Sequence, residues 1–348
     1  MLYLSLCALN NTKPDIKCVE KMDLDELYKS CQLHKITALV CYALESVITP
    51  SKKWLEAKGK AIRKNLLFDV ERQQITNFMN KNGIKHLPLK GIILKEYYPK
   101  AGMRQMSDND IYYDGNFREQ LEEFMLSIGY KCKLKTDNHD IYEKQPIYNF
   151  EMHHSFFSKE NYETLYRYYS DIEKRMIKDE NNAYGYHLSN EDFYIYIIAH
   201  EYKHFSGCGT GIRSLLDCIV LLHKFEKSLD WNYIRCETDK LGLTDFEESQ
   251  RKLCKKLSSS FDEANFTQNE TELLQYFVSS GVYGDYKIDI VNKMTGEIGT
   301  VNRKITFGMK VKYIFKRLFP PMHIYKKYYP LFLLSQISYP FLLFLSGL

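Results

Sequence analysis

The stretch from Ile84 to Phe156 constrains the fold most, because strand-like and helix-like patterns alternate there in short segments. Alternating or continuous apolar runs predict strands, and apolar spacing of three and four residues predicts helices. In chain order we predict a strand, a helix, a strand, a helix and three further strands, at residues 86–89, 92–98, 108–113, 117–128, 130–134, 140–144 and 147–153. This order predicts a small mixed sheet with helices on one face, and therefore an α+β fold.

Helical patterns flank this region on both sides. Apolar residues from Asp23 to Val47 predict one amphipathic helix, and a second helix is expected from about Trp54 to Met79. After Ser158 strand signals nearly vanish, and we predict helices at 192–205, 212–225, 244–257 and 270–280. A chain of 348 residues is long enough for about two domains. We expect N-terminal helices packing on the core over residues 1–80, a sheet domain over 81–158, a helical domain over 159–300 and a basic, then apolar, tail over 301–348.

Composition excludes several classes of protein. Hydrophobic residues make up 45% of the chain and charged residues 26%, which argues against disorder and low complexity. The formal net charge of +4 is too small to imply nucleic-acid binding by itself. The nine cysteines are odd in number and form no C-x-x-C pair, so neither a disulfide framework nor a cysteine-rich zinc site is expected. The first nine residues lack the basic start and cleavage site of a signal peptide, and we expect a cytoplasmic protein.

Three carboxylates are the candidate catalytic and metal-binding residues. Asp108 and Asp110 share one face of a predicted strand because the side-chain period of a strand is two. Glu151 shares a face of the last predicted strand with Asn149 and His153, and adds a third oxygen donor if the two strands are neighbours. Converging carboxylate oxygens favour Mg²⁺ or Mn²⁺. Taken alone, an Asp-x-Asp pair is more often solvated polarity at a turn or strand end, so the companion motifs decide the interpretation.

The companion motifs occur in a fixed order: Leu89-Lys90-Gly91, Tyr97-Tyr98-Pro99, Arg104, Asp108-x-Asp110, Glu151-Met152-His153, His200-x-x-x-His204, Gly211-Ile212-Arg213, Leu216-Asp217 and Leu318-Phe319-Pro320. This set resembles the poorly characterised bacterial nucleotidyltransferase family of the DNA polymerase β-like superfamily. The resemblance implies a polymerase β-like palm domain, a helical second domain and transfer of a nucleotide. Two features depart from the superfamily pattern. The usual Gly-Ser loop is Lys90-Gly91 here, and the gap from this loop to Asp108 is longer.

A site of this kind supports a mechanism that uses two metal ions together with a nucleoside triphosphate. Asp108 and Asp110 would bridge both ions, and Glu151 would hold the ion nearer the attacking group, whose proton it can accept. Five further positions are candidates for contact with the nucleotide: Lys90, Gly91, Arg104 and, as the resemblance implies, His204 and Arg213 across the cleft. Gly91 opens a predicted helix and offers backbone N–H groups to phosphate oxygens.

Two alternatives remain open at this point. The first is a catalytically inert nucleotide-binding or regulatory module on the same fold. The second rests on His200-Glu201-Tyr202-Lys203-His204, which matches the H-E-x-x-H pattern of zinc proteases. A third zinc ligand is required, and the position that should supply it is Thr210. Hydrogen bonding of the two histidines to a neighbouring helix is the simpler explanation.

The tail is basic and aromatic from Lys310 to Tyr329 and uncharged from Leu331 to Leu348. Such a segment can dock on the helical domain or contact an anionic membrane surface. The basic excess lies beside the apolar tail rather than beside the carboxylates. We therefore expect a small-molecule or peptide acceptor in preference to RNA, which remains open.

Overall fold

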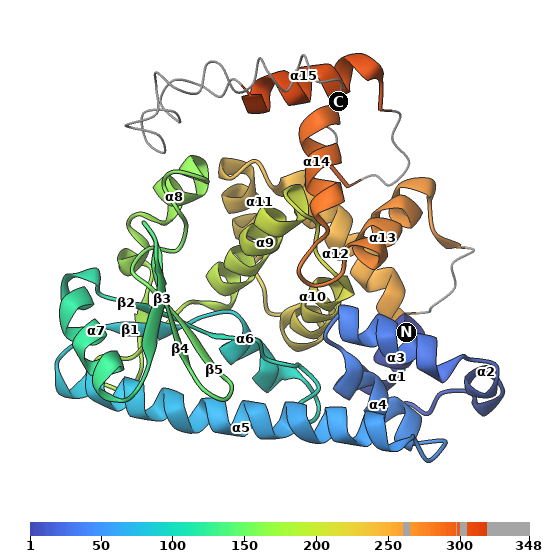
Figure 1. Ribbon diagram of the computed structural model, residues 1–348, viewed down its shortest axis with the longest axis horizontal. Coiled ribbons are helices and arrows are strands. Elements are labelled where there is room, and N and C mark those ends of the chain that lie inside the picture. Colours follow the sequence, from blue (N-terminus) through green and yellow to red (C-terminus); the bar gives the residue numbers. More distant parts are fainter. Residues whose placement is uncertain (260–264, 297, 300–304, 319–348) are drawn as a thin grey trace, which may run out of the picture.

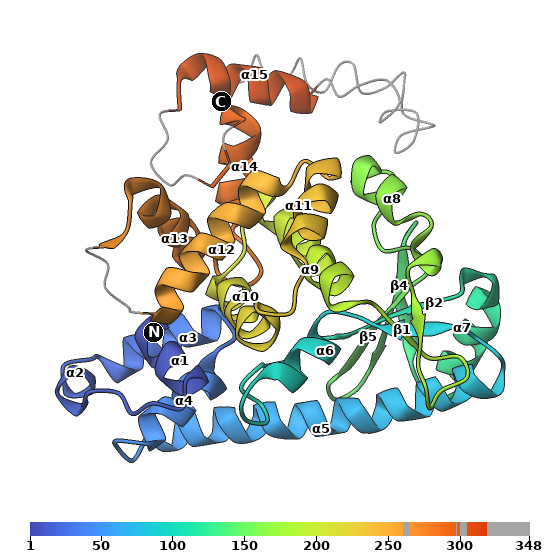
Figure 2. The same ribbon diagram turned by 180° about the vertical axis from the view of Figure 1, so that it is seen from behind.

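The computed structural model describes residues 1–259, 265–296, 298–299 and 305–318. The described part contains a five-stranded sheet at one end and helices elsewhere, and a 30-residue helix runs beneath both (Figures 1 and 2). This long helix is α5 (Lys52–Lys81), which was predicted over nearly the same residues. It follows four shorter helices: α1 (Leu2–Leu9), α2 (Ile16–Glu20), α3 (Leu24–Leu33) and α4 (Thr37–Glu45).

The structure confirms the predicted order of strands and helices in the sheet region. Its elements are β1 (His86–Pro88), α6 (Gly91–Leu94), the 3-10 turn η1 (Lys95–Tyr97), β2 (Asn109–Tyr113), the 3-10 turn η2 (Gly115–Phe117), α7 (Arg118–Ser127), β3 (Lys131–Lys135), β4 (His139–Lys144) and β5 (Tyr148–His153). The strand order is β1-β2-β5-β4-β3. Strands β2 and β5 are parallel and the other pairs are antiparallel, so the sheet is mixed, as predicted.

The two faces of this sheet have different surroundings. Alternation along β2 and β5 directs one set of side chains toward α5 and α7, where they form a buried apolar cluster that includes Phe68, Met79, Ile111, Tyr113, Leu121, Met125, Phe150 and Met152. The opposite set includes Asp110 and Glu151. These polar side chains therefore face the helical half of the molecule across a cavity.

Helices make up most of the chain after the sheet. The elements are α8 (Glu163–Tyr169), the 3-10 turn η3 (Ile172–Lys174), β6 (Ile177–Lys178), β7 (Tyr186–His187), α9 (Asn190–Ser206), α10 (Ile212–Phe225), α11 (Trp231–Lys240), α12 (Thr244–Ser259), α13 (Gln268–Ser280), α14 (Tyr286–Thr295) and α15 (Phe307–Leu318). Four of these helices were predicted. The two-residue strands β6 and β7 were not, because they are too short to produce an alternating pattern. Helices α1 and α4 share one large apolar core with α9, α10 and α12.

The prediction of a single helix from Asp23 to Val47 is wrong. The segment forms α3 and α4, which are separated at His34 and Lys35, and Lys35 has a φ of 54°. The His34 ring is buried, and its Nδ1 accepts a hydrogen bond from the Ile212 amide at 3.2 Å. Its Nε2 lies 3.1 Å from the Val278 carbonyl oxygen. These contacts with α10 and α13 stabilise the break, and local apolar spacing carries no sign of them.

The nine cysteines are all free, in agreement with the sequence. In the described ranges no helix combines the length and the apolar character that a membrane crossing requires. The expected apolar segment from Leu331 to Leu348 lies outside the described residues, as do Phe319 and Pro320.

Candidate active site

Three carboxylates meet on the sheet face that is turned toward α9 and α10. The parallel pairing of β2 with β5 sets Asp110 directly beside Glu151, and Asp108 immediately precedes β2. Asp110 is buried, whereas Asp108 and Glu151 are half-buried and line the same cavity of about 370 Å³. The structure places all eight residues expected from the sequence along this cavity: Lys90, Gly91, Arg104, Asp108, Asp110, Glu151, His204 and Arg213.

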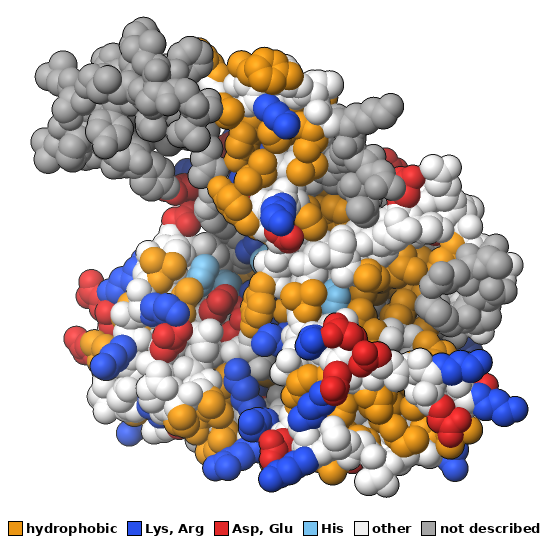
Figure 3. Space-filling view, turned by 45° about the vertical axis from the view of Figure 1, so that its right-hand side comes forward, with side chains coloured by type: hydrophobic (Ala, Val, Ile, Leu, Met, Phe, Trp, Pro, Cys, Tyr) orange, Lys and Arg blue, Asp and Glu red, His pale blue; other side chains and the backbone are white. Residues whose placement is uncertain are grey.

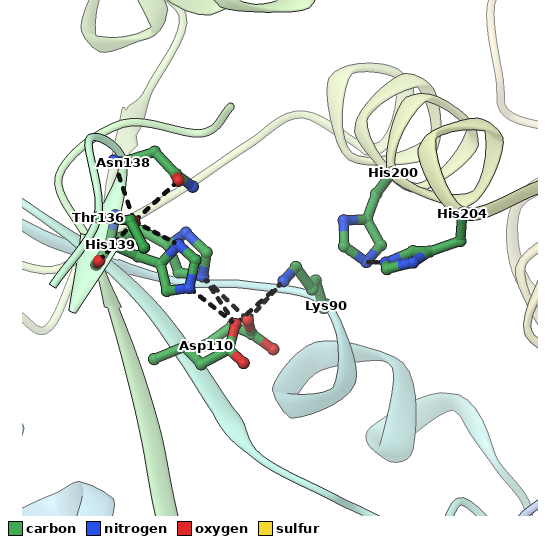
Figure 4. A network of polar contacts seen from close by, with 9 residues as sticks. Lys90, Asp110, Thr136, Asn138, His139, His200 and His204 are labelled. Atoms are coloured by element: carbon green, nitrogen blue, oxygen red, sulfur yellow. Dashed lines mark hydrogen bonds and ion pairs between the residues drawn. The ribbon is translucent and has the colours of Figure 1, made fainter. Parts of the chain in front are cut away.

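Lys90 already supplies one positive charge to the carboxylates. Its ammonium lies 2.5 Å from an Asp110 oxygen and 4.0 Å from a Glu151 oxygen (Figure 4). The lysine occupies the turn between β1 and α6 with a φ of 47°, a region that favours glycine. A non-glycine residue held there commonly marks a functional turn. In this structure Lys90 is paired with carboxylates, and was expected from the sequence to contact a phosphate.

Gly91 is required by close packing. A Cβ atom at this position would lie 2.4 Å from Nη1 of Arg104 and 2.8 Å from the Met106 sulfur. Helix α6, which Gly91 opens, has only four residues, so its dipole offers less charge to a phosphate than a long helix would. The position therefore serves mainly to let the Lys90-Gly91 turn approach Arg104.

Arg104 is paired inside the protein. Its Nε and Nη2 donate to the two carboxylate oxygens of Asp217 at 2.8 and 2.9 Å, and the Tyr98 hydroxyl donates to the same carboxylate at 2.7 Å. Burial opposes the charge of Arg104, but Asp217 outweighs burial and raises its pKa. Arg213 lies nearby on α10 and has no carboxylate partner in the described part of the chain. Its Nη1 lies 3.5 Å from the Gln105 carbonyl oxygen. Arg213 is therefore better placed than Arg104 to offer charge to a ligand.

Two histidines belong to the site although the sequence did not single them out as site residues. His153 Nε2 lies 3.0 Å from an Asp110 oxygen and 3.6 Å from a Glu151 oxygen. One ligand atom from each of these three residues lies within 4.8 Å of the others. The His139 ring stacks on His153 with centroids 4.9 Å apart, and burial together with the charge of His153 lowers the pKa of His139 to about 4. The alternation that identified Glu151 also placed His153 on the same strand face. The sequence could therefore have identified His153 as a site residue.

The three carboxylates titrate differently. Burial and the charges of Asp110 and Glu151 raise the pKa of Asp108 to about 6. Burial acts in the same direction on Asp110, but the attraction of Lys90 and the hydrogen bond from His153 outweigh it and lower the pKa of Asp110. Burial also opposes the charge of Lys90, yet Asp110 raises its pKa. At neutral pH the cluster therefore holds more negative charge than Lys90 balances.

The wall opposite the carboxylates is formed by α9 and α10 and is basic. Lys203 on α9 is half-buried and has no carboxylate within ion-pair distance among the described residues. Burial and the charge of Lys90 lower its pKa to about 8. Burial and Lys203 lower the pKa of His204 to about 3, so this histidine is neutral. Lys203 was missed in the sequence because it lies inside the His-Glu-x-x-His pattern and was counted as a variable position.

The His200 and His204 rings face each other, with their Nε2 atoms 3.2 Å apart, across the cavity from Asp110 (Figure 4). Glu201 accepts a hydrogen bond from Gln250 of α12 at 2.6 Å, and burial raises its pKa well above the usual range. Thr210 pairs with a neighbouring serine. Throughout the described ranges, no Asp, Glu, Cys or His forms a three-ligand group with the two histidines. The geometry therefore does not favour the zinc protease alternative.

A mixed sheet that presents three carboxylates to a basic wall of helices is suited to hold a polyphosphate through divalent cations. This arrangement is typical of enzymes that transfer phosphoryl or nucleotidyl groups. A family model described as "Uncharacterised nucleotidyltransferase" matches residues 20–259, which is more than half of the chain. The chain belongs to this family and is a transferase, as the resemblance in the sequence implied. No curated protein and no solved structure matches the chain significantly.

Proposed function

We propose that the protein transfers a nucleoside monophosphate from a nucleoside triphosphate to an acceptor hydroxyl or phosphate and releases pyrophosphate. The observation that carries the proposal is the meeting of Asp108, Asp110 and Glu151 in one cavity whose opposite wall offers Lys203 and Arg213. Family membership supports a nucleoside triphosphate as one substrate.

The donor set fits a divalent cation. The site offers two carboxylates and the His153 imidazole within 4.8 Å of one another, with Asp108 beside them. The Lys90 ammonium among these oxygens shows that the site stabilises positive charge. Oxygen ligands suit Mg²⁺, and an added imidazole suits Mn²⁺ equally well. When bound, such ions would lower the pKa of the attacking hydroxyl and neutralise charge on the phosphates.

The protein's own side chains accept the proton of the acceptor and stabilise charge on the leaving pyrophosphate. The acceptor hydroxyl passes its proton to a carboxylate, and Asp108 is the strongest base of the three because its pKa is the highest. The acceptor oxygen then forms a bond to the α-phosphorus, and the bond from this phosphorus to the oxygen that bridges the α- and β-phosphates breaks. Lys203 and Arg213 stabilise the charge that develops on pyrophosphate.

A screen of the four common nucleoside triphosphates tests this proposal. Each is added with Mg²⁺ or Mn²⁺, and both the melting temperature and pyrophosphate release are measured. We expect metal and nucleotide together to raise the melting temperature, because metals held by few carboxylates need substrate phosphates as further ligands. Asp110→Asn should abolish the shift and the transfer. The matched control Asp239→Asn removes an exposed carboxylate from α11 and should change neither. No shift with any pair would refute the proposal.

One observation favours an inert nucleotide-binding module as a second candidate. The Lys90–Asp110 ion pair occupies the position in which a cation would be held, and a protein could keep such a pair permanently. This module would show a thermal shift with nucleotide alone, equal in the presence of EDTA and of Mg²⁺. Pyrophosphate release above that of the Asp110→Asn variant excludes it.

For the acceptor, we propose a small molecule or peptide in preference to RNA. The net charge is modest, and the basic helix α15 lies on the side of the molecule opposite α5, away from the sheet (Figures 1 and 2). RNA binding would fall with salt at a log-log slope of roughly 0.7 to 0.9 for each phosphate contacted. A gel shift with bulk tRNA at low and moderate salt is the test. Tight, strongly salt-dependent binding would reverse this preference.

We also propose a cytoplasmic protein whose tail either docks on the helical domain or contacts an anionic membrane surface. Nine free cysteines support a reducing compartment. Helix α15 exposes Phe307, Val311 and Ile314 together with Lys310, which is the composition of a surface-bound helix. Co-sedimentation of the full chain with phosphatidylserine vesicles tests the membrane contact. Failure to sediment, or equal sedimentation with neutral vesicles, would refute it.

A further inference from the structure

A second cavity, of about 390 Å³, lies beside the carboxylate cavity. It is formed by α3, the first turn of α4, the first half of α5 and residues 105–107. Its lining contains four lysines and a single acidic residue: Lys35, Lys53, Lys60, Lys64 and Glu56. We call it the lysine cavity. In Figure 3 Lys and Arg side chains gather in the lower middle of the face shown.

Most of this positive charge is not neutralised by the protein. Lys53 forms an ion pair with Asp25. Lys35, Lys60 and Lys64, in contrast, have no carboxylate within ion-pair distance among the described residues. Lys64 is half-buried and donates only to the Ser107 carbonyl oxygen, at 3.0 Å. Three unpaired ammonium groups around one cavity repel one another, which a bound anion would relieve.

The backbone at Lys35 supports a role for this side chain. Lys35 occupies the break between α3 and α4 with a φ of 54°, a conformation that is uncommon for residues other than glycine and asparagine. Its ammonium lies 5.5 Å from the centre of the Tyr283 ring. The hydrogen-bonded end of α3 thus places Lys35 where it lines the lysine cavity.

The lysine cavity adjoins the carboxylate cavity. Ser107 and Tyr283 line both cavities, and their hydroxyl oxygens lie 3.2 Å apart. Ser107 immediately precedes Asp108, so the segment that carries the Asp108 carboxylate also forms a wall of the lysine cavity. Tyr283 is 71% exposed and can move without disturbing the core. A ligand held by the lysines can therefore extend past these two hydroxyl groups toward Asp108.

We propose that the lysine cavity binds a phosphate group of the acceptor, and that the acceptor is a small phosphate monoester. This inference rests on the proposed function, because it assigns the second substrate of the same site. The phosphate would lie among Lys35, Lys60 and Lys64, and the nucleophilic end would reach Asp108. The volume suits one small molecule, since ligand cavities commonly measure about 300 to 1,000 Å³. The cavity is too small to follow several phosphates of a polynucleotide.

The test uses ribose 5-phosphate as the probe, neutral ribose as its uncharged counterpart, and the full chain in EDTA without nucleotide. We expect calorimetry to detect ribose 5-phosphate binding to the wild type and at least tenfold weaker binding of ribose. The double variant Lys35→Glu, Lys60→Glu should weaken ribose 5-phosphate binding at least tenfold. Arg63→Glu, which reverses a single charge on the exposed side of α5, should leave it unchanged. Equal melting temperatures show that both variants fold.

Several outcomes would overturn the proposal. These are no binding of ribose 5-phosphate, equal binding of ribose, or equal weakening by Arg63→Glu. Weaker binding of Mg²⁺ with a nucleoside triphosphate in the double variant, with ribose 5-phosphate unaffected, would assign the lysines to the donor instead. Steeply salt-dependent binding of a 5′-phosphorylated RNA oligonucleotide, tighter than that of ribose 5-phosphate, would assign the cavity to RNA. Asp110→Asn should leave ribose 5-phosphate binding intact, so failure of the proposed function is distinguishable from failure of this inference.

Discussion

Asp108 and Asp110 are two residues apart, yet neutralising each should change stability in opposite directions. We expect Asp108→Asn to stabilise the metal-free protein at pH 8 and Asp110→Asn to destabilise it. Asp108 has a pKa of about 6 in the folded protein, because burial and two neighbouring carboxylates oppose its charge. Asp110 has a lowered pKa, because Lys90 and His153 favour its charge despite burial.

The magnitude for Asp108 follows from the two pKa values. An unfolded aspartate has a pKa of about 3.9, so folding raises it by about 2 units, each worth about 1.4 kcal/mol. Since the folded state binds the proton more tightly, this aspartate lowers stability progressively as pH rises from about 4 to about 6. The full penalty at pH 8 is about 3 kcal/mol. Asp108 is half-buried, and screening by solvent reduces the expected gain in the asparagine variant to about 2 kcal/mol.

The charge of Asp110, in contrast, stabilises the folded protein. Its contribution is present above the unfolded pKa of about 3.9 and disappears as pH falls toward the folded value. Removing its charge leaves Lys90 without its closest partner. Breaking a buried pair in this way costs about 3 to 5 kcal/mol. The nearby Glu151 compensates in part, and we expect a loss of about 2 to 3 kcal/mol at pH 8.

Urea unfolding followed by circular dichroism, in EDTA at pH 4 and at pH 8, measures both effects. The Asp108→Asn gain should be present at pH 8 and nearly absent at pH 4. Saturating Mg²⁺ and nucleoside triphosphate should then reverse the order, because binding at 100 times Kd adds about 2.7 kcal/mol to the wild type alone. An Asp108→Asn variant that is less stable than wild type at pH 8, or whose gain does not depend on pH, would refute the electrostatic reasoning.

Three further predictions concern the surroundings of the carboxylates. Gly91→Ala should lower the free energy of unfolding by about 1 to 3 kcal/mol, because the new methyl group would overlap Arg104, and thermal denaturation measures this loss. Glu201→Gln should change stability by less than about 1 kcal/mol and leave transfer intact, because burial raises the pKa of Glu201 and so opposes its charge, and Gln250 can still donate to glutamine. A hydrolase that used Glu201 as its base would instead lose activity. If transfer needs the Lys203 ammonium, the rate should fall above about pH 8, and Lys203→Arg should abolish this fall in a pH–rate profile.

The sequence predicted which strand faces carry the carboxylates, because local periodicity determines those faces. A period of two placed Asp110 and Glu151 on defined faces of their strands, and the turns limited where each strand could end. The parallel pairing of β2 with β5 joins residues 41 positions apart, Asp110 and Glu151, and had to be assumed. The structure supplies this pairing.

The partners of the cationic residues could not be predicted. Arg104 was assigned to a phosphate, but it pairs with Asp217, which lies 113 residues away on α10. Lys90 was assigned to a phosphate as well, and it contacts Asp110 across the sheet. Any nearby carboxylate can satisfy a long cationic side chain, so sequence spacing cannot identify the partner. The lysine cavity combines lysines from α5 with one from the break at Lys35, which the sequence pattern did not reveal.

The Lys90 ammonium occupies an Asp110 oxygen that the proposed divalent cation would also bind. If the proposal holds, a bound cation would compete with the lysine for this oxygen and would free the lysine for the triphosphate. Lys90→Met should therefore tighten binding of Mn²⁺ alone, measured by calorimetry, because the carboxylates lose their internal cation while burial stays similar. The same variant should be less stable in EDTA, because Asp110 loses its ion-pair partner. It should also lose transfer, because no ammonium remains at this position to bind the phosphates. The control Lys81→Met removes a charge at the end of α5 and should alter none of these. Mn²⁺ binding that is weakened or unchanged in Lys90→Met would show that the ion does not occupy the position of the ammonium.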